Sequence, residues 1–418
     1  MKNVIVAHPG KQHSYRLASA LKKAGMLDCY VTTIYNKNTF FDKFLSKFLS
    51  KDNKKRAEKR RNPDLVDSEV VQFCSFRGLV ETFLYRTDKS KRIYEKYRQK
   101  TANKFGEKVA KLAIKRNVDA VVMYDTNAAK CFEILSKKAP SIKRILDVSI
   151  ATGPCLRDIY DREIKNSMKN DLRMNNAHFW EDKTTENLNN EIKYSDYFLA
   201  ASNFVLKSIE YCGADRSKIE IVPYGANVSI AEEKKFNNAA KKLLILFVGQ
   251  VNHRKGVPYL LKAVSELKEE VIDLTLVGAY NPKDWFVKEY MEKPNIHFIG
   301  LVTFDKMKEY YSDSDVFVID SFAEGMAQVG IEAMACGLPI ICSTNSGVND
   351  LVTEGENGFI IPPGDADVLK EKLQWFIDNR DKIPEMSENA LEVGRKYTWE
   401  YYEDNIEKAF KEILGDEA

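Results

Sequence analysis

The stretch "DVFVIDSFAEGMAQVGIEAMACGLPIICS", residues 315–343, reads as a strand, a turn, a helix and a second strand. Apolar residues over 315–320 and 339–343 predict buried strands, and a helix beginning near Met326 is expected to end at Gly337. A strand, a crossover helix and another strand form the repeating unit of a parallel sheet that is covered by helices. The stretch therefore predicts an α/β fold.

The same alternation of apolar strands and amphipathic helices continues along the whole chain and gives two groups of strands. The first group comprises residues 3–8, 29–34, 120–125, 144–149, 197–202 and 219–223. The second group comprises residues 243–249, 273–278, 296–300, 315–320, 339–343 and 358–362. We predict two doubly wound, Rossmann-like domains with a cleft between them, where ligands bind beyond the carboxyl ends of the strands.

The chain has 418 residues, which is more than one compact core usually accommodates. We predict an N-terminal domain over 1–228, a polar linker over 229–242 and a C-terminal domain over 243–397. Residues 398–418 predict a helix that packs back on the N-terminal domain. Four residues of this helix recur at helical spacing, which predicts that they lie in the core: Trp399, Tyr402, Ile406 and Phe410.

Composition describes an ordinary globular protein, with 44% apolar and 30% charged residues. The net charge is +3, but the two halves of the chain have opposite charge. Residues 1–228 contain 43 Lys and Arg against 27 Asp and Glu, whereas residues 229–418 contain 21 Lys and Arg against 34 Asp and Glu. The longest apolar run, 243–248, is far shorter than a membrane span. The seven scattered cysteines form no CxxC pair, which indicates reduced thiols and a cytoplasmic protein.

Two glutamates stand out in the deciding stretch, Glu324 on the turn and Glu332 about two turns into the helix. A helix N-terminus suits a phosphate, and the small residue Gly325 lets the backbone approach one closely. A carboxylate among apolar residues needs hydrogen-bond donors, which the vicinal hydroxyls of a ribose supply. The pair can thus hold one nucleotide sugar, with Glu332 at the ribose and Glu324 at the transferred sugar. The alternative is a solvent-facing Glu332 and a helix-capping Glu324.

Residues 321–352, "SFAEGMAQVGIEAMACGLPIICSTNSGVNDLV", resemble the donor-site signature of the family-4 glycosyltransferases of GT-B architecture. Further motifs that carry the resemblance are "HPGKQHSYRLASAL", "LFVGQVNHRKGVPYLLKAV" and "NGFIIPPGD". The resemblance implies transfer of a sugar from a nucleotide donor with retention at the anomeric carbon and without a bound metal. The Lys- and Asn-rich composition indicates a bacterial source, for which assembly of surface polysaccharides or other glycoconjugates is the expected setting.

The resemblance also implies roles for individual residues. Lys255 and Arg254 would neutralise the leaving diphosphate, and His13 would face the reaction centre. The family usually has an arginine where this chain has Gln250, and Arg254 is the candidate to replace its charge. The implied donor-binding residues are Gly10, Gly249, Gln250, Val302, Gly325, Met326, Ala327, Gln328 and Glu332. Solvated loop cations remain the alternative for Arg254 and Lys255.

Three residues of the N-terminal domain are candidates for contact with the acceptor. Asp125 and Asn127 end one predicted strand, and Thr152 stands where relatives often carry a histidine beside the donor sugar. The sequence "SDSD", 312–315, resembles a metal-binding Asp-x-Asp, but a helix-to-strand turn away from the carboxyl edge explains it. We therefore expect no metal site and no other cofactor.

Residues 39–61, "TFFDKFLSKFLSKDNKKRAEKRR", combine an apolar helix face with a cationic face. Residues 37–61 contain ten Lys and Arg against three Asp and Glu, a composition typical of helices that lie in an anionic membrane surface. Packing of this face on its own domain is the alternative. Nucleic acid is a third option, for which the sequence offers no recognition motif.

The expected partners are therefore a nucleotide sugar, a glycan or lipid-linked acceptor, and an anionic membrane surface on the cytoplasmic side. Two other functions remain open at this point. One is a nucleotide-sugar epimerase of the same architecture. The other is a catalytically weak module that binds a sugar nucleotide or a membrane, which the residues Gln250 and Thr152 favour.

Overall fold

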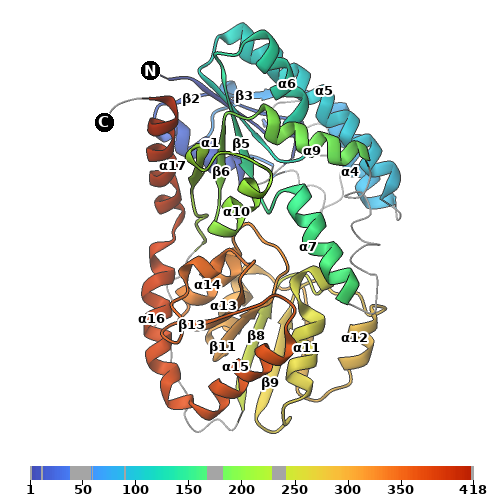
Figure 1. Ribbon diagram of the computed structural model, residues 1–418, viewed down its shortest axis with the longest axis vertical. Helices are drawn as coiled ribbons and strands as arrows, with labels where there is room; N and C mark the ends of the chain where they lie inside the picture. The colour runs from blue at the N-terminus through green and yellow to red at the C-terminus, as the bar shows by residue number, and fades with distance from the viewer. Residues whose placement is uncertain are drawn as a thin grey trace.

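The computed structural model describes residues 2–10, 13–37, 58, 60–88, 91–166, 182–227 and 242–415. Two parallel sheets, each flanked by helices, lie one above the other along the long axis of the molecule (Figure 1). The upper sheet has seven strands in the order β3-β2-β1-β4-β5-β6-β7. These are β1 (Val4–Ala7), β2 (Leu27–Thr32), β3 (Val70–Gln72), β4 (Ala120–Tyr124), β5 (Lys143–Val148), β6 (Tyr197–Ala200) and β7 (Ile219–Ile221).

The lower sheet has six strands in the order β10-β9-β8-β11-β12-β13. These are β8 (Leu243–Val248), β9 (Ile272–Val277), β10 (Ile296–Gly300), β11 (Val316–Ile319), β12 (Ile340–Ser343) and β13 (Gly358–Ile361). Their central strands are buried on both faces, as in β11, where all four residues are buried. Burial on both faces explains why these strands appear in the sequence as continuous apolar runs rather than as alternating ones.

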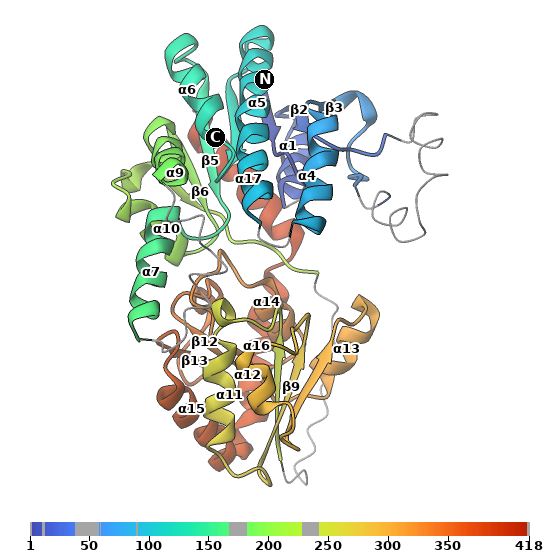
Figure 2. The same ribbon diagram turned by 90° about the vertical axis from the view of Figure 1, so that its right-hand side faces the viewer.

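Helices cover both faces of each sheet (Figures 1 and 2). The N-terminal domain contains α1 (Ser14–Lys23), α4 (Ser75–Thr87), α5 (Arg92–Arg116), α6 (Ala129–Lys138), α7 (Gly153–Asn166), α9 (Asp182–Tyr194) and α10 (Asn203–Tyr211). The C-terminal domain contains α11 (Val257–Ser265), α12 (Trp285–Tyr290), α13 (Phe304–Ser312), α14 (Gln328–Ala335), α15 (Ala366–Asp378) and α16 (Ile383–Lys396). Within the described residues, no helix combines the length and the apolar character needed to cross a bilayer.

The last helix, α17 (Trp399–Leu414), crosses from the lower domain and runs beside α1 of the upper one (Figure 1). Lys23 on α1 forms an ion pair with Glu403 on α17. Tyr402, Ile406 and Phe410 are buried against this domain, as their spacing predicts, whereas Trp399 is half-buried. Trp399 nevertheless packs against the core cluster that contains the other three residues.

The predicted fold class, two Rossmann-like α/β domains, is confirmed by the two parallel sheets. All twelve predicted strands are present, with ends that shift by one or two residues. The short strand β3 was not predicted, because it is only three residues long and includes a glutamine. The proposed membrane segment, 39–61, lies outside the described residues except for Glu58, Arg60 and Arg61.

Candidate active site

The candidate site lies where the strand order reverses in each sheet. In the upper sheet the chain continues from β1 to β2 on one side and from β4 to β5 on the other. In the lower sheet it continues from β8 to β9 on one side and from β11 to β12 on the other. Open parallel sheets bind ligands in the crevice at such switch points. His13 follows β1, Lys255 follows β8 and Glu324 follows β11, so each predicted catalytic side chain comes from a loop at a switch point.

Glu324 binds two cations at once. Its Oε1 lies 2.6 Å from Nη1 of Arg254 and 2.6 Å from Nζ of Lys255. Burial alone would raise the pKa of Glu324, but the two adjacent cations outweigh burial and hold that pKa below its ordinary value. Burial lowers the pKa of Lys255, and Glu324 opposes that change. The group carries two positive charges and one negative charge, and its surplus cation suits an anionic ligand.

The loop after β8 is fixed in place by its own capping. Asn252 accepts a hydrogen bond from the Lys255 amide through Oδ1 at 3.1 Å, which closes a short 3-10 turn over His253–Lys255. Gly256 has φ +72°, and a Cβ there would lie 1.9 Å from the carbonyl oxygen of Asp320. Only glycine allows the loop after β8 to approach the end of β11 this closely. The approach places Arg254 and Lys255 next to the end of β11.

The two domains meet directly beside Glu324. A Cβ on Gly325 would lie 2.1 Å from the carbonyl oxygen of Ser149, which follows β5 in the N-terminal domain. Ser202, the N-cap of α10, donates its hydroxyl to the carbonyl oxygen of Gly325 at 2.7 Å. The Asn203 amide donates to Asp350 Oδ2 at 2.7 Å. The predicted donor loop therefore forms part of the domain interface.

Helix α7 of the N-terminal domain also contributes to this interface. Its residues Leu156, Ile159 and Tyr160 form a buried apolar cluster with Phe322 and Ala323. The Tyr160 side chain is buried close to the charges of Arg254 and Glu324, and burial raises its pKa to about 12. Further along α7, Glu163 Oε1 lies 2.8 Å from Nε2 of the buried His253.

Glu332 lies on α14, with one carboxylate oxygen in a protein hydrogen bond. Tyr311 Oη donates to Glu332 Oε2 at 3.1 Å, and burial raises the pKa of Glu332 while this hydrogen bond opposes the rise. Helix α14 begins at Gln328, two residues later than predicted, after the buried residues Met326 and Ala327. Val302, which follows β10, packs against the same apolar cluster.

The remaining predicted donor residues lie in the loops after β1 and β8. Gly10 donates its amide to His8 Nδ1 at 2.9 Å, and burial lowers the pKa of His8 to about 4. Gly249 has φ +151°. Its carbonyl oxygen lies close to Gly278, where an added Cβ would be 1.8 Å from that oxygen. Gln250 is exposed, and its Oε1 accepts a hydrogen bond from Asn252 Nδ2 at 3.2 Å.

His13 is held by a buried polar group of the N-terminal domain. Its Nε2 lies 3.2 Å from both carboxylate oxygens of Asp147 and 3.1 Å from the hydroxyl of Tyr224. Its ring also packs against those of Tyr124 and Tyr224. These contacts fix the imidazole at the carboxyl edge of the upper sheet.

The three predicted acceptor residues differ in how they are placed. Asp125 accepts the Ser149 amide at 3.0 Å, beside the interface at Gly325. Asn127 is buried next to Glu191, whose carboxylate accepts backbone amides of this turn and whose pKa burial raises to about 8. Thr152 is buried and donates its hydroxyl to Ser208 O at 2.8 Å, so it bonds to α10.

Several contacts at this site carry no sequence signature. Ser202 lies 123 positions from Gly325, Tyr160 lies 94 positions from Arg254, and no local pattern relates either pair. Asp315, from the "SDSD" stretch, precedes β11 and accepts the Leu244 amide at 2.9 Å, at the opposite edge of the sheet. No group of three potential metal-ligating side chains occurs among the residues that the structure describes.

Comparison with known proteins supports the interpretation of the C-terminal domain. Residues 229–393 match the model of the family "Glycosyl transferases group 1". This range contains Arg254, Lys255, Glu324 and Glu332, so the match supports a group 1 glycosyltransferase domain around these residues.

Curated relatives match only part of the chain. The uncharacterized glycosyltransferase MJ1069 of Methanocaldococcus jannaschii is 28% identical over 58% of this chain and 64% of its own length. The putative colanic acid biosynthesis glycosyltransferase WcaL of Escherichia coli is 24% identical over 43% of this chain and 47% of its own length. The chain therefore spans less than two thirds of the length of the curated relatives that it matches.

Solved structures match over the whole length of the chain. Sucrose-phosphate synthase from Thermosynechococcus elongatus aligns with a TM-score of 0.67 at 17% identity, over 100% of both chains. HepE of Anabaena, in complex with UDP-glucose, aligns with a TM-score of 0.61 at 15% identity, over 99% of this chain and 100% of its own. At such low identity these likenesses establish the two-domain fold, in agreement with the predicted GT-B architecture.

Proposed function

We propose that this protein is a retaining glycosyltransferase that moves a sugar from a nucleoside diphosphate to a hydroxyl of a glycan or a lipid-linked acceptor. The observation that carries the proposal is the group of Arg254, Lys255 and Glu324 at the switch point of the C-terminal sheet. A surplus cation there would stabilise the negative charge that develops on a leaving diphosphate. Two side-chain cations supply this charge without requiring a metal.

In the proposed reaction the acceptor oxygen bonds to the anomeric carbon while the bond from that carbon to the diphosphate oxygen breaks. The diphosphate leaves toward Lys255 and Arg254, and the acceptor proton passes to it. The anomeric configuration is retained because the acceptor oxygen attacks the anomeric carbon from the same face of the sugar from which the diphosphate leaves. Glu324 orients the transferred sugar, and Glu332 binds the ribose. Enclosure between the two domains would exclude water from the reaction.

HepE is the reason to test uridine nucleotides first, because it was crystallised with UDP-glucose. The role in surface polysaccharide or glycoconjugate assembly rests on relatives such as WcaL. The decisive experiment incubates the protein with UDP-sugars and GDP-sugars, with and without glycan acceptors, and follows the products by NMR. Transfer with a retained anomeric configuration supports the proposal, whereas an inverted product contradicts the mechanism.

The same experiment separates the two alternative functions. An epimerase would convert the donor in the absence of any acceptor. A binding module would bind the donor yet show neither transfer nor slow hydrolysis. The geometry favours transfer over mere binding, because His13 is held by Asp147 and Tyr224 at the sheet edge where an acceptor hydroxyl would enter.

Contact of the N-terminal domain with an anionic membrane on the cytoplasmic side is a further part of the proposal. The sequence of 39–61 suggested it, and the described helix α4 gives independent support. Three apolar residues on one face of α4 are exposed, Phe76 by 77%, Leu79 by 56% and Phe83 by 63%. Helices α4 and α5 lie side by side on the outside of this domain (Figure 2).

Vesicle sedimentation tests the membrane contact. We expect the protein to sediment with phosphatidylserine vesicles and to do so less after Phe76→Ser and Phe83→Ser are combined. Removing the charges over residues 54–61 should also reduce sedimentation, since each basic residue near such a surface contributes about 1 kcal/mol. If neither the substitutions on α4 nor the removal of charge over residues 54–61 alters sedimentation, the membrane contact is contradicted.

A further inference from the structure

A pocket lies beside the candidate active site, on the side of α1. It has a volume of about 370 Å³ and is lined by residues of both domains. His13 and Arg16 come from α1 and its start, Asp64 from the loop before β3, Gln328 from the start of α14 and Trp399 from the start of α17. Because His13 and Gln328 also belong to the candidate site, the pocket adjoins the place where the acceptor hydroxyl would react.

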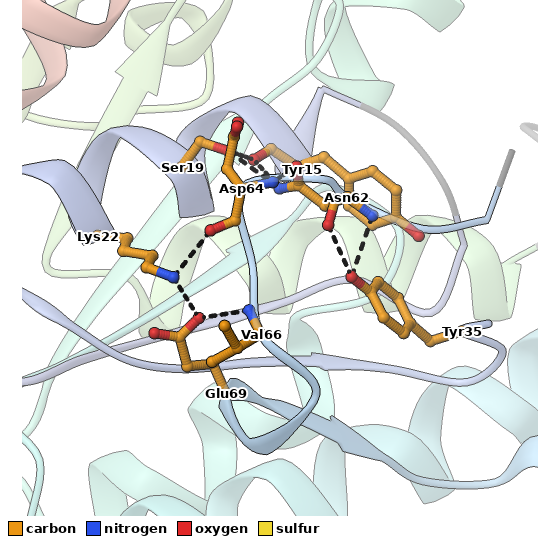
Figure 3. Close-up of polar contacts among 8 residues, drawn as sticks. All are labelled: Tyr15, Ser19, Lys22, Tyr35, Asn62, Asp64, Val66 and Glu69. Atoms are coloured by element: carbon orange, nitrogen blue, oxygen red, sulfur yellow. Dashed lines mark hydrogen bonds and ion pairs between the residues drawn. The ribbon is translucent and has the colours of Figure 1, made fainter. Parts of the chain in front are cut away.

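A buried polar network fixes one wall of this pocket (Figure 3). Asn62 is buried, and its side-chain amide donates to the carbonyl oxygen of Tyr15 at 3.0 Å and to Ser19 Oγ at 2.9 Å. The backbone amide of Asn62 donates to Tyr35 Oη at 3.0 Å. Ser19 Oγ in turn donates to Asp64 Oδ2 at 2.8 Å. These bonds attach the loop that carries Asn62 and Asp64 to α1.

A second attachment lies one turn further along α1 (Figure 3). Lys22 Nζ donates to the carbonyl oxygen of Asp64 at 2.8 Å and to Glu69 Oε2 at 2.8 Å. The same oxygen of Glu69 accepts the amide of Val66 at 2.8 Å. Because the buried and paired Asn62 is held rigidly, the wall keeps its shape before any ligand arrives.

Arg16 supplies the pocket with a cation. Its guanidinium carbon lies 4.8 Å from the centre of the Trp399 ring, a cation–π distance. The guanidinium itself forms no hydrogen bond or ion pair with the residues that the structure describes. The other arginine of the pocket, Arg61, is by contrast paired with Asp67 Oδ1 at 2.9 Å.

Trp399 is oriented by its contacts with Asn227, which also lines the pocket, and with Tyr402. Its indole N–H donates to Asn227 Oδ1 at 3.2 Å, and its ring meets that of Tyr402 edge to face at 5.6 Å. The helix that begins at Trp399 is capped by Thr398, whose hydroxyl accepts the Tyr401 amide. The indole is therefore held in one orientation beside Arg16, as a flat apolar surface next to a charge.

We propose that this pocket binds the acceptor and that it selects a saccharide with an anionic group, a carboxylate or a phosphate. The sugar ring lies by Trp399, its hydroxyls bond to Asp64 and Gln328, and its anionic group pairs with Arg16. A guanidinium suits this role because it binds two oxygens of a carboxylate or phosphate at once. The inference rests on the proposed function, since it makes His13 the residue that the reacting hydroxyl approaches.

Ligand-observed NMR and calorimetry test the pocket with three probes, namely methyl β-D-glucuronide, glucose 6-phosphate and the neutral methyl β-D-glucoside. UDP is present at saturation so that the probes cannot occupy a nucleotide site. We expect at least one anionic probe to bind the wild-type protein more tightly than the neutral glycoside. The glucuronide and the phosphate distinguish the two sources of negative charge.

Arg16→Met is the decisive variant, because its unbranched side chain can still pack on Trp399 without a charge. We expect it to weaken binding of the anionic probe at least about 10-fold and to leave the affinity for methyl β-D-glucoside unchanged. Arg16→Lys should retain part of the affinity, which separates a charge effect from a packing effect. Arg395→Met removes an exposed arginine from α16 and serves as the matched control.

Two results would overturn the inference: neither anionic probe binds the wild-type protein better than the neutral glycoside, or Arg16→Met binds them as tightly as wild type. Failure of the proposed function looks different. In that case no nucleotide shifts the melting temperature of the wild-type protein and no donor is hydrolysed, whether or not the anionic probes bind. A folded Arg16→Met variant is recognised by an unchanged melting temperature and an unchanged shift with UDP.

Discussion

Lys255 and Glu324 come from loops that follow two neighbouring strands, β8 and β11, and their charged atoms lie 2.6 Å apart. Sequence separates them by 69 positions, yet the parallel sheet brings both loops to one edge. The carboxylate stays ionised because two cations adjoin it, and burial would otherwise favour its neutral form. This pairing explains how a carboxylate can lie inside the domain interface.

Glu324→Gln should lower the rate of sugar transfer about 100-fold or more, because the amide carries no charge to orient the sugar or to hold the two cations. Nucleotide binding should survive, since Arg254 and Lys255 remain. Steady-state kinetics and calorimetry with the same protein sample separate the two effects. A variant with wild-type transfer would remove Glu324 from the mechanism.

Glu332→Leu should weaken donor binding by about 10- to 100-fold, the usual cost of losing a hydrogen bond to a charged group. The control is Tyr311→Phe, which deletes only the hydroxyl that donates to Glu332 Oε2. We expect the control to bind the donor nearly as well as wild type. Equal affinities of Glu332→Leu and wild type would show that this carboxylate does not bind the ribose.

Gly325→Ala should destabilise the contact between the domains, because the added Cβ would lie 2.1 Å from the carbonyl oxygen of Ser149. Overpacking of this kind usually costs about 1–3 kcal/mol. Thermal unfolding and the donor affinity measure the effect. Gly355→Ala is the control for backbone strain alone, since alanine is strained at φ +79° but its Cβ would meet no atom. Wild-type stability and donor affinity of Gly325→Ala would mean that the interface adapts.

His8 should make the protein less stable in acid. Burial lowers its pKa from 6.5 to about 4, with the charge of His13 acting in the same direction, so the folded state holds the neutral ring. The unfolded chain binds the proton first, and stability is therefore present above pH 6.5 and lost as pH falls from 6.5 through 4. The loss should reach about 3 kcal/mol at most.

The pH dependence is checked by denaturant unfolding of His8→Asn between pH 4 and pH 8. An asparagine oxygen can still accept the Gly10 amide but does not titrate in this range. The control, His297→Asn, changes a histidine on β10 that is 44% exposed and whose Nε2 lies 2.8 Å from Asp273 Oδ1. We expect a flatter stability profile for His8→Asn only; parallel profiles for His8→Asn and wild type would contradict the assignment.

The fold was predictable because its signals are local. Buried parallel strands give apolar runs, and a residue such as Gly337, with φ +73°, marks where a helix must end. β3 was missed because its sequence, Val-Val-Gln, is too short to show a period and becomes a strand only by pairing with β2. Tertiary pairing rather than local propensity decides such short strands.

The candidate site was predictable only in part. Glu324, Lys255 and Arg254 lie in loops that directly follow predicted strands, and the sheet topology brings them together. The contacts of Gly325 with Ser149 and Ser202 cross between domains, and no spacing in the sequence predicts them. Trp399 has the spacing of a core residue, but it is the first residue of α17, and its ring lies beside Arg16 in the pocket.

The most direct test of the account is calorimetric titration of UDP and GDP into the wild-type protein and into a variant that combines Arg254→Met with Lys255→Met. We predict that at least one nucleoside diphosphate binds the wild type with micromolar affinity and that the double variant binds it at least about 50-fold more weakly, since charge-assisted hydrogen bonds to a diphosphate are lost. Absence of binding to the wild-type protein, or equal binding to the double variant, would contradict the central claim that these two cations receive the diphosphate of a sugar donor.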